Sequence, residues 1–363
     1  RYEQSDYMSL DSSTKRNLEL SSSMHEGKLE GSLISVLDQT ITPMGGRLLR
    51  RWLTHPLKQL DSIQQRLKRV EILFEQRTVR TDIRESLKKI GDLERLVSRI
   101  CVGRCSARDI RQLGYSLQVI PELMAHTTEL ESDTLGQELQ SLPDSSEWVD
   151  YIEKHIADEP PATIRDGGII RTGWNPELDE LRDIAQNGKK YIAKIKDALT
   201  QEVGISTLKI GYNKVFGYYI EVTNAHKDKV PDHFIRKQTL VNAERYITPE
   251  LKEIEEKILS AEDKSKALEA DLFEQVREHI AQFADGIQRI ATVISTLDVY
   301  QSLAQIAFTN GYVKPELDQG STLEIIKGRH PVVERSLPVG EPFIPNDIRL
   351  DQQDEQIMII TGP

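Results

Sequence analysis

The sequence of 363 residues has only two cysteines and no long hydrophobic run. Two cysteines cannot build a disulfide framework, so a reducing cytosol is the expected compartment. Crossing a bilayer takes about 18 consecutive apolar residues, so we expect no membrane span and no membrane partner. No basic segment followed by an apolar one opens the chain, which argues against a secretory leader.

Recognisable chemistry is also scarce. Aromatic residues make up 6% of the chain, and no Ser–His–Asp or Cys–His arrangement is apparent, so we predict no catalytic residue. Cys101 and Cys105 stand four residues apart, but no second Cys or His pair is near, so we expect buried thiols rather than metal ligands. Hydrophobic residues still make up 38%, enough for folded cores, and the length predicts two or three domains.

The first part of the chain, to about residue 160, has the periodicity of amphipathic helices. Apolar residues recur every three or four positions over 48–53, 63–73 and 87–100. This spacing predicts a helical domain with ordinary buried faces.

The pattern changes near residue 163. Two short β-branched runs flank an Asp-Gly-Gly sequence over 163–171, which predicts a β-hairpin. Asn175-Pro176 and Thr248-Pro249, each followed by Glu-Leu, are typical helix starts, because Asn or Thr caps the first N–H groups and Pro suits the first turn.

Both predicted helices carry apolar residues at alternating spacings of three and four. The pattern runs over 181–199 in the first helix and over 251–297 in the second, with an irregularity near Val276. We interpret the two segments as a coiled-coil pair with a stutter. The second helix is expected to continue to Leu297, roughly 75 Å at 1.5 Å per residue.

A β-rich insert lies between these helices. Apolar residues alternate over 208–212 and 218–222, which predicts two strands at the far end of a two-helix arm. Its aromatic residues are expected to form the core of this small sheet rather than to stack on bases.

The insert reverses the charge of the chain. The net charge is −11, yet residues 205–247 contain seven Lys or Arg and four acids. Basic and hydroxyl or amide side chains are the usual partners of nucleic-acid phosphates. The insert includes Lys214, Arg236, Lys237, Thr239 and Asn242. The alternative is a solvated surface with a modest charge excess, and composition alone does not decide between them.

The end of the chain changes character again. Residues 323–326 are predicted to form a strand, and the apolar run 356–360 is predicted to form a buried parallel strand. This run leads into Thr361-Gly362-Pro363, where a phosphate-binding loop could open, but the remaining residues of such a loop are not present.

Several long stretches closely resemble one family, that of the MutS mismatch-repair sensors. They are residues 33–40, 44–53, 214–222, 236–253, 328–334 and 359–363. The resemblance covers nearly the whole chain, in the right order. It implies a mainly α fold: a helical core with a long two-helix coiled-coil lever, a small β-rich clamp at its tip, and the first strands of an α/β P-loop ATPase domain.

The resemblance also implies domain bounds. They are 1–11 for the end of a connector domain, 12–188 for the helical core with the first lever helix, 189–248 for a DNA clamp, 249–312 for the second lever helix returning to the core, and 313–363 for the truncated start of an ATPase domain.

The family's phosphate contacts fall on Lys237 and Asn242, with Arg236 as a helper. One position departs from the family pattern, because Val241 stands where a Lys is frequent. At the nucleotide site, the adenine-stacking aromatic residue corresponds to Phe343, beside Ile344. The phosphate-binding loop would open at Gly362 and Pro363.

These correspondences imply part of a sliding clamp that grips duplex DNA without reading its sequence. The longer parent is expected to be a cytoplasmic, nucleoid-associated homodimer that uses ATP or ADP with Mg²⁺ and works with a MutL-type partner. The chain stops before the P-loop lysine, so on its own we expect it to bind no nucleotide and to be inactive as an ATPase. Two alternatives stay open: a relative that binds recombination junctions, and a coiled-coil scaffold with no nucleotide role.

Overall fold

The computed structural model describes residues 6–24, 27–127, 134–213, 217–338 and 340–360, without the side chains of Thr134, Lys189 and Leu259. The fold is mainly helical and includes a small antiparallel sheet, as predicted. It divides into two compact units, of which unit 1 has residues 1–101, 112–149 and 281–363, and unit 2 has residues 102–111 and 150–280. Within the described residues, no helix has the length and apolarity that crossing a membrane requires.

Unit 1 is a bundle of short helices around one long helix, α13 (Ala284–Asn310). Helix α13 is apolar on most of its circumference, and Ile287, Ile290, Ile294 and Leu297 are fully buried. The short helices of this unit are α1 (Ser12–Asn17), α2 (Leu33–Leu37), α3 (Pro43–Thr54), α4 (Leu60–Glu75), α5 (Arg77–Leu87), α6 (Leu93–Cys101), α8 (Ile120–His126) and α9 (Thr134–Gln140). Helices α7 (Ala107–Gln118) and α10 (Ser146–His155) have residues in both units.

The periodic segment 87–100 is two helices rather than one. Helix α5 ends at Leu87 and α6 begins at Leu93. Between them, the backbone N–H of Gly91 donates to the hydroxyl of Ser116 at 3.0 Å. The chain can leave the helix here because a side chain from another segment satisfies the backbone group that the helix would otherwise pair.

The last part of unit 1 confirms one predicted strand and contradicts the other. Strand β5 (Leu323–Gly328) pairs antiparallel with β6 (Asn346–Leu350), and α14 (Pro331–Ser336) lies between them in the chain. Residues 356–360 form no strand, and the side chains of 357–360 are exposed. A buried parallel strand needs neighbouring strands, and in the described residues β5 and β6 pair only with each other.

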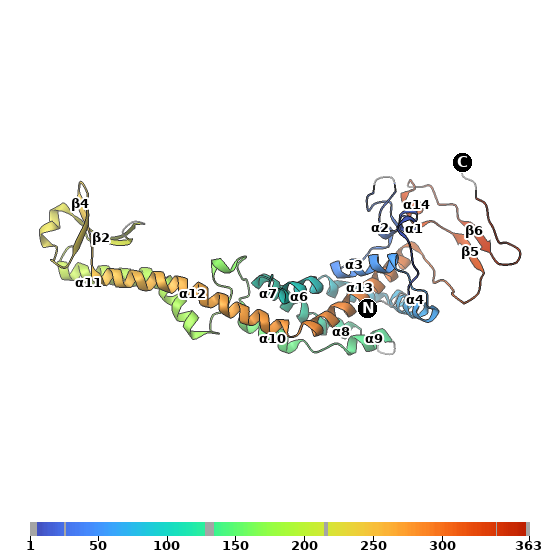
Figure 1. Ribbon diagram of the computed structural model, residues 1–363, viewed down its shortest axis with the longest axis horizontal. Coiled ribbons are helices and arrows are strands. Elements are labelled where there is room, and N and C mark those ends of the chain that lie inside the picture. Colours follow the sequence, from blue (N-terminus) through green and yellow to red (C-terminus); the bar gives the residue numbers. More distant parts are fainter. Residues whose placement is uncertain (1–5, 25–26, 128–133, 214–216, 339, 361–363) are drawn as a thin grey trace. The chain divides into compact units, whose positions relative to one another are not determined.

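Unit 2 contains two long helices and a four-stranded sheet. Helix α11 (Pro176–Val203) runs beside α12 (Pro249–Ala281), and the sheet lies at one end of the pair (Figure 1). A Cβ atom at Gly188 would lie 2.8 Å from Ile258, so glycine allows the two helices to approach closely here. The strands are β1 (Lys209–Asn213), β2 (Gly217–Thr223), β3 (Ile235–Thr239) and β4 (Ala243–Ile247), with the short helix η3 (Asn224–Lys229) after β2.

Both predicted helix starts are confirmed. The side chain of Asn175 accepts a hydrogen bond from the N–H of Leu178 at 2.9 Å, and Pro176 is the first residue of α11. The hydroxyl of Thr248 accepts one from Leu251 N–H at 3.2 Å. These signals are local, which is why the sequence is enough to place them.

The expected continuous helix from 249 to 297 is wrong. Helix α12 ends at Ala281, and α13 begins at Ala284. At the interruption, Phe283 stacks on Trp148 with ring centroids 5.2 Å apart. The apolar periodicity continues across the break because both helices bury a face, and periodicity reports burial rather than helix continuity.

The predicted hairpin over 163–171 is also wrong. This segment contains a 3₁₀ turn, η2 (Ile164–Asp166), and Ile170 forms an isolated bridge with Ile156. The buried carboxylate of Glu269 accepts hydrogen bonds from the N–H groups of Gly168 and Ile170, both at 2.9 Å. These N–H groups therefore pair with a side chain instead of with an opposing strand.

The expectation of two buried thiols fails for Cys101, which is exposed. Cys101 is the last residue of α6, and its neighbours Val97 and Ile100 make the buried face. Cys105 is half-buried, and burial raises the pKa of its thiol to about 11.

Candidate nucleic-acid interface

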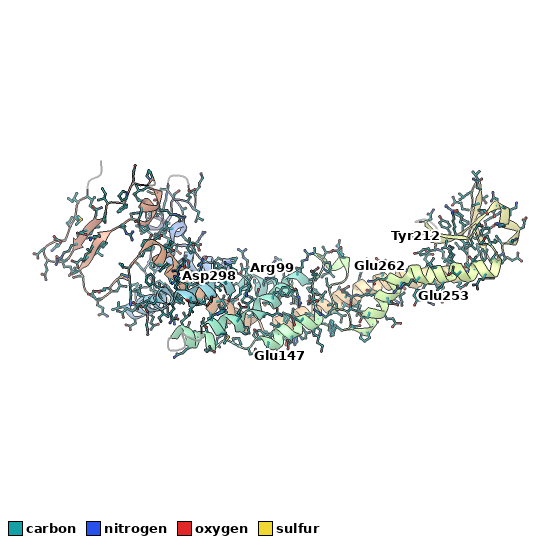
Figure 2. All side chains as sticks on the ribbon, turned by 180° about the vertical axis from the view of Figure 1, so that it is seen from behind. Arg99, Glu147, Tyr212, Glu253, Glu262 and Asp298 are labelled. Atoms are coloured by element: carbon teal, nitrogen blue, oxygen red, sulfur yellow. The ribbon has the colours of Figure 1, made fainter. Side chains whose placement is uncertain are left out.

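The sheet of unit 2 has one face against the helices. Its strand order is β1-β2-β4-β3, with antiparallel neighbours throughout. Ile220 stands opposite both Ile210 and Tyr246, and these residues pack with Leu199 and Leu251 of the helices. This core includes Phe234 and Tyr246, which confirms the structural role predicted for these aromatic residues, whereas Tyr212 (labelled in Figure 2) is exposed.

The hairpin of β3 and β4, residues 235–247, carries most of the predicted phosphate contacts, and we call it the tip hairpin. Arg236 stands opposite Tyr246, and Gln238 stands opposite Arg245, so Lys237 is an extra residue between two consecutive partners. This is a β-bulge, which redirects the side chain of the additional residue. Lys237 is exposed, and in the described part of the chain its ammonium group has no ion pair.

The turn of the tip hairpin is held from outside the hairpin. The backbone N–H of Asn224 donates to the carbonyl of Asn242 at 3.1 Å, and its side-chain amide donates to the carbonyl of Val241 at 3.0 Å. Asn224 is the first residue of η3 and was not among the predicted site residues. Its role could not be found from the sequence, because it depends on how η3 lies against a turn 17 residues later.

A polar cluster on the tip hairpin sets its charge. The guanidinium of Arg236 lies 3.4 Å from the carboxylate of Glu244, and the hydroxyl of Tyr246 donates to the same carboxylate. The hydrogen bond from Tyr246 and the charges of Arg236 and Lys227 hold the pKa of Glu244 below its usual value. Burial, followed by the bond to Glu244, raises the pKa of Tyr246 to about 12. Glu244 therefore stays ionised and partly neutralises Arg236, which leaves Lys237 as the more available cation.

Arg245 has a different role. Its guanidinium lies 3.0 Å from Glu221, donates to Gln238 at 3.0 Å, and stacks 4.2 Å from the ring centroid of Tyr219. Arg245 therefore links three strands on the face of the sheet away from the core. A count of basic residues overstates the positive charge available to a ligand, because this arginine is already paired.

The predicted residues are partly brought together. Arg236, Lys237, Thr239 and Asn242 are exposed on the tip hairpin, as is Val241, whose exposed fraction is 92%. Lys214 lies outside the described residues. In unit 1, Phe343 is half-buried and Ile344 is 80% exposed. Gly362 and Pro363 also lie outside the described residues.

Comparison of the sequence with known proteins identifies its family. Residues 13–304 match the family described as MutS domain III. The chain is 49% identical over 363 residues to the DNA mismatch repair protein MutS of Salinibacter ruber, covering 100% of this chain and 40% of that protein. It is 47% identical over 363 residues to the protein of that name from Bacteroides fragilis, covering 100% of this chain and 42% of that protein. A third relative, from Myxococcus xanthus, is 44% identical over 364 residues, covering 100% of this chain and 41% of that protein.

The matched region defines the class, which is a helical MutS domain with the strands of the tip inserted between two long helices. The chain belongs to the MutS family. It spans about two fifths of the length of the curated relatives it matches.

Proposed function

We propose that this chain is the part of a DNA mismatch-repair protein that grips the backbone of duplex DNA through the tip hairpin. The relatives described above are DNA mismatch repair proteins by name. These names favour repair over the recombination alternative. The repair reaction itself, like the partners, belongs to the longer protein.

The observation that carries this proposal is the bulge at Lys237. It leaves an exposed cation near Thr239 and Asn242, whose hydroxyl and amide groups hydrogen-bond phosphate oxygens well. A two-stranded ribbon presenting these groups along its edge is suited to phosphates rather than to base edges. Binding is therefore expected to be independent of sequence and steeply salt-dependent.

The two long helices support a mechanical role. Helices α11 and α12 share a core with the sheet and approach closely at Gly188. Packed rigid helices of this kind are suited to pass a movement from one end to the other. We propose that they act as a coiled-coil lever, as the resemblance implies, in a homodimer that also engages a MutL-type partner and works on bacterial chromosomal DNA.

A nucleotide site is proposed only for the longer protein. Phe343 offers a ring that can stack on adenine, and Ile344 offers an exposed aliphatic side chain. Neither residue can ligate phosphate or Mg²⁺, so these two residues do not hold ATP or ADP by themselves.

Fluorescence anisotropy with labelled duplex DNA over a salt series tests the proposal. Matched and mismatched duplexes are expected to bind equally, because the tip hairpin would touch only the backbone. In an Arg236→Ala/Lys237→Ala protein, affinity should fall at every salt concentration. The slope of log K against log[salt] should become shallower by about 1 for each phosphate that the protein no longer neutralises.

The matched control is Lys264→Ala, which removes an exposed lysine from α12, outside the tip hairpin. This variant should retain both the affinity and the salt slope of the parent. The proposal is wrong if the parent chain shows no binding at low salt, or if Lys264→Ala reduces binding as much as the double change.

A further inference from the structure

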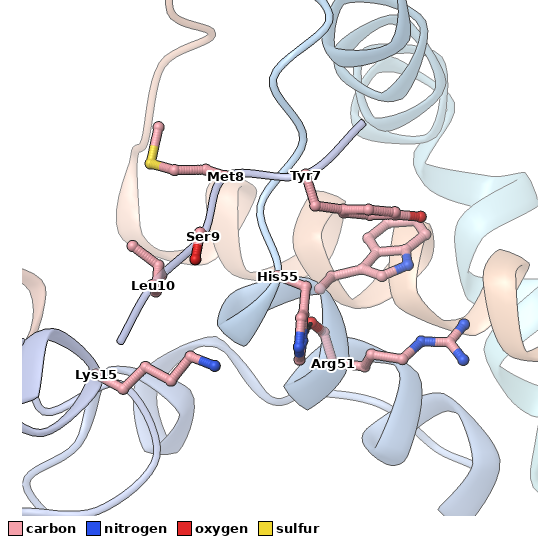
Figure 3. Close-up of a pocket in the computed structure, with 8 residues that line it drawn as sticks. Tyr7, Met8, Ser9, Leu10, Lys15, Arg51 and His55 are labelled. Atoms are coloured by element: carbon pink, nitrogen blue, oxygen red, sulfur yellow. Dashed lines mark hydrogen bonds between the residues drawn. The ribbon is translucent and has the colours of Figure 1, made fainter. Parts of the chain in front are cut away.

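Unit 1 contains a cavity that the proposed function does not use. Its volume is about 370 Å³, and it lies between the extended segment 6–10, helix α1 and the end of α3 (Figure 3). The cavity is lined by basic and aromatic side chains, among them Lys15, Arg51, His55, Trp52 and Tyr7. Volumes near the lower end of roughly 300–1,000 Å³ are typical of sites for small organic ligands.

The walls of the cavity are fixed by the backbone. Tyr7 forms a β-bridge with Leu57, and the N–H of Met8 donates to the carbonyl of Pro56 at 2.8 Å. The N–H of Lys58 donates to the carbonyl of Asp6 at 3.0 Å. Segment 6–10 is therefore held against the chain that follows α3, which brings α1 and its Lys15 to the cavity.

Trp52, part of the aromatic wall, packs against two neighbouring side chains. The guanidinium of Arg66 lies 3.6 Å from the ring centroid of Trp52, and the ring of Tyr300 lies 5.3 Å away, tilted by 58°. An indole supported in this way loses little conformational freedom when a ligand binds.

The ionisable side chains in the described lining of the cavity include three basic ones. Among the described residues that line the cavity are Lys15, Arg51 and His55 but no acid. His55 caps the end of α3, where its Nδ1 lies 3.0 Å from the hydroxyl of Thr54 and 3.3 Å from the carbonyl of Arg51. Its other nitrogen, Nε2, makes no hydrogen bond within the part of the chain that the structure describes. Figure 3 shows Lys15 extending into the cavity from the opposite side.

We propose that this cavity binds a nucleoside monophosphate or an organic phosphate of the same size and shape. The phosphate would interact with Lys15 and His55, because charge-assisted bonds to phosphate are strong. The nearby Asp11, which feels the charge of Lys15, does not line the cavity. The flat base would lie against the wall that Trp52 and Tyr7 form, since aromatic rings favour stacked or edge contacts. The bound ligand would tie segment 6–10 and α1 to α3.

Isothermal titration of the 363-residue chain with AMP, adenosine and inorganic phosphate tests this proposal. AMP is expected to bind more tightly than adenosine or phosphate, because only AMP has both the anion and the ring. Lys15→Glu should weaken AMP binding by about tenfold or more. The matched control is Arg16→Glu, an equal charge change at an exposed neighbour on α1 that does not line the cavity.

Arg16→Glu is expected to change the affinity for AMP by less than about twofold. A Phe343→Ala variant distinguishes the cavity from the nucleotide site proposed for the longer protein, and it should bind AMP as the parent does. The proposal is overturned by a lack of saturable AMP binding, by equal loss in Lys15→Glu and Arg16→Glu, or by loss in Phe343→Ala alone. Phosphate binding as tight as AMP binding would exclude a ligand with a ring.

Discussion

A buried carboxylate in unit 1 and an exposed ammonium group in unit 2 serve opposite purposes. In unit 1, Asp298 of α13 is 0% exposed and accepts hydrogen bonds from the N–H and hydroxyl of Thr42 at 2.7 and 2.6 Å. The N–H of Ile41 and the amide of Gln301 also donate to it, at 2.9 and 2.6 Å. In unit 2, Lys237 of the tip hairpin is exposed, with no ion pair in the described part of the chain.

The difference shows how burial and pairing assign a role to a polar residue. Burial raises the pKa of Asp298, since a low-dielectric site disfavours the charged form. Its donors offset that effect and fix the start of α3 against α13. The buried carboxylate therefore fixes neighbouring segments through the hydrogen bonds it accepts, whereas an exposed cation with no ion pair among the described residues contributes little to stability and is available to bind a ligand.

The largest expected effect comes from breaking the buried cluster. Asp298→Ala leaves the donors of Thr42, Ile41 and Gln301 without their acceptor inside the protein. The free energy of unfolding should fall by roughly 3 kcal/mol or more, because each buried donor left without an acceptor costs about 1–3 kcal/mol. Denaturant unfolding of unit 1 measures this. Asp285→Ala, at an exposed position of the same helix, should cost no more than about 1 kcal/mol, and an equal loss in both variants would remove the distinction.

Gly45→Ala tests the same cluster by crowding it. A Cβ atom at Gly45 would lie 2.2 Å from Oδ2 of Asp298, so the carboxylate would have to move away from its donors. Thermal or denaturant unfolding should show a loss of roughly 1–3 kcal/mol, typical of overpacking. An unchanged stability would mean that the carboxylate is not confined.

Asn224→Ala should have an intermediate effect on stability, through the turn of the tip hairpin. It removes the 3.0 Å bond from the side-chain amide to Val241 but keeps the backbone bond to Asn242. The loss of stability should be about 1 kcal/mol. DNA affinity, measured by anisotropy, should fall because the turn is less well fixed. Thr223→Ala is the control, since this exposed neighbour makes no side-chain cap bond to η3, and it should bind DNA as the parent does.

His155 extends the comparison to a buried polar group of unit 2. Burial lowers the pKa of His155 in the folded protein, and the charges of Lys154 and His279 lower it further. The unfolded state therefore takes up a proton more readily, so the stability from neutral His155 is complete above about pH 6.5 and is lost as the pH falls. Melting curves at pH 7.5 and 5.5 should show a smaller pH-dependent drop in His155→Gln than in the parent. An equal drop would contradict this assignment.

The smallest effect on stability is expected for Lys237→Ala. Its side chain has no ion pair among the described residues, so the free energy of unfolding should change by no more than about 0.5 kcal/mol. DNA affinity should nevertheless fall. A clear loss of stability in this variant would show that Lys237 belongs to the fold and would remove the contrast with Asp298.

Whether an element could be predicted depends on how far apart its interacting residues lie along the chain. The helix starts at Asn175 and Thr248 and the alternation of β1 and β2 were predicted, because the partners lie 3 residues away for the caps and 4 to 12 residues away for the strands. The segment 163–171 was not, since the carboxylate that occupies its N–H groups comes from Glu269, 101 residues after Gly168. The break between α12 and α13 likewise depends on Trp148.

In the candidate interface, too, features that depend on nearby residues were predictable and those that depend on distant contacts were not. Arg236, Lys237, Thr239 and Asn242 lie on one hairpin, so their order along the chain already brings them together. The bulge at Lys237, the pairing of Arg245 with Glu221 and the bond from Asn224 to the turn depend on contacts between strands and with η3.

The sequence by itself determined the family, the helical character and the segment that carries the basic tip, because local patterns encode all three. Tertiary structure decided which polar residues are buried and satisfied, which cations remain available, and where the cavity beside Trp52 forms. Those properties depend on partners remote in the chain, and hydrogen bonding and burial are decided only when those partners meet.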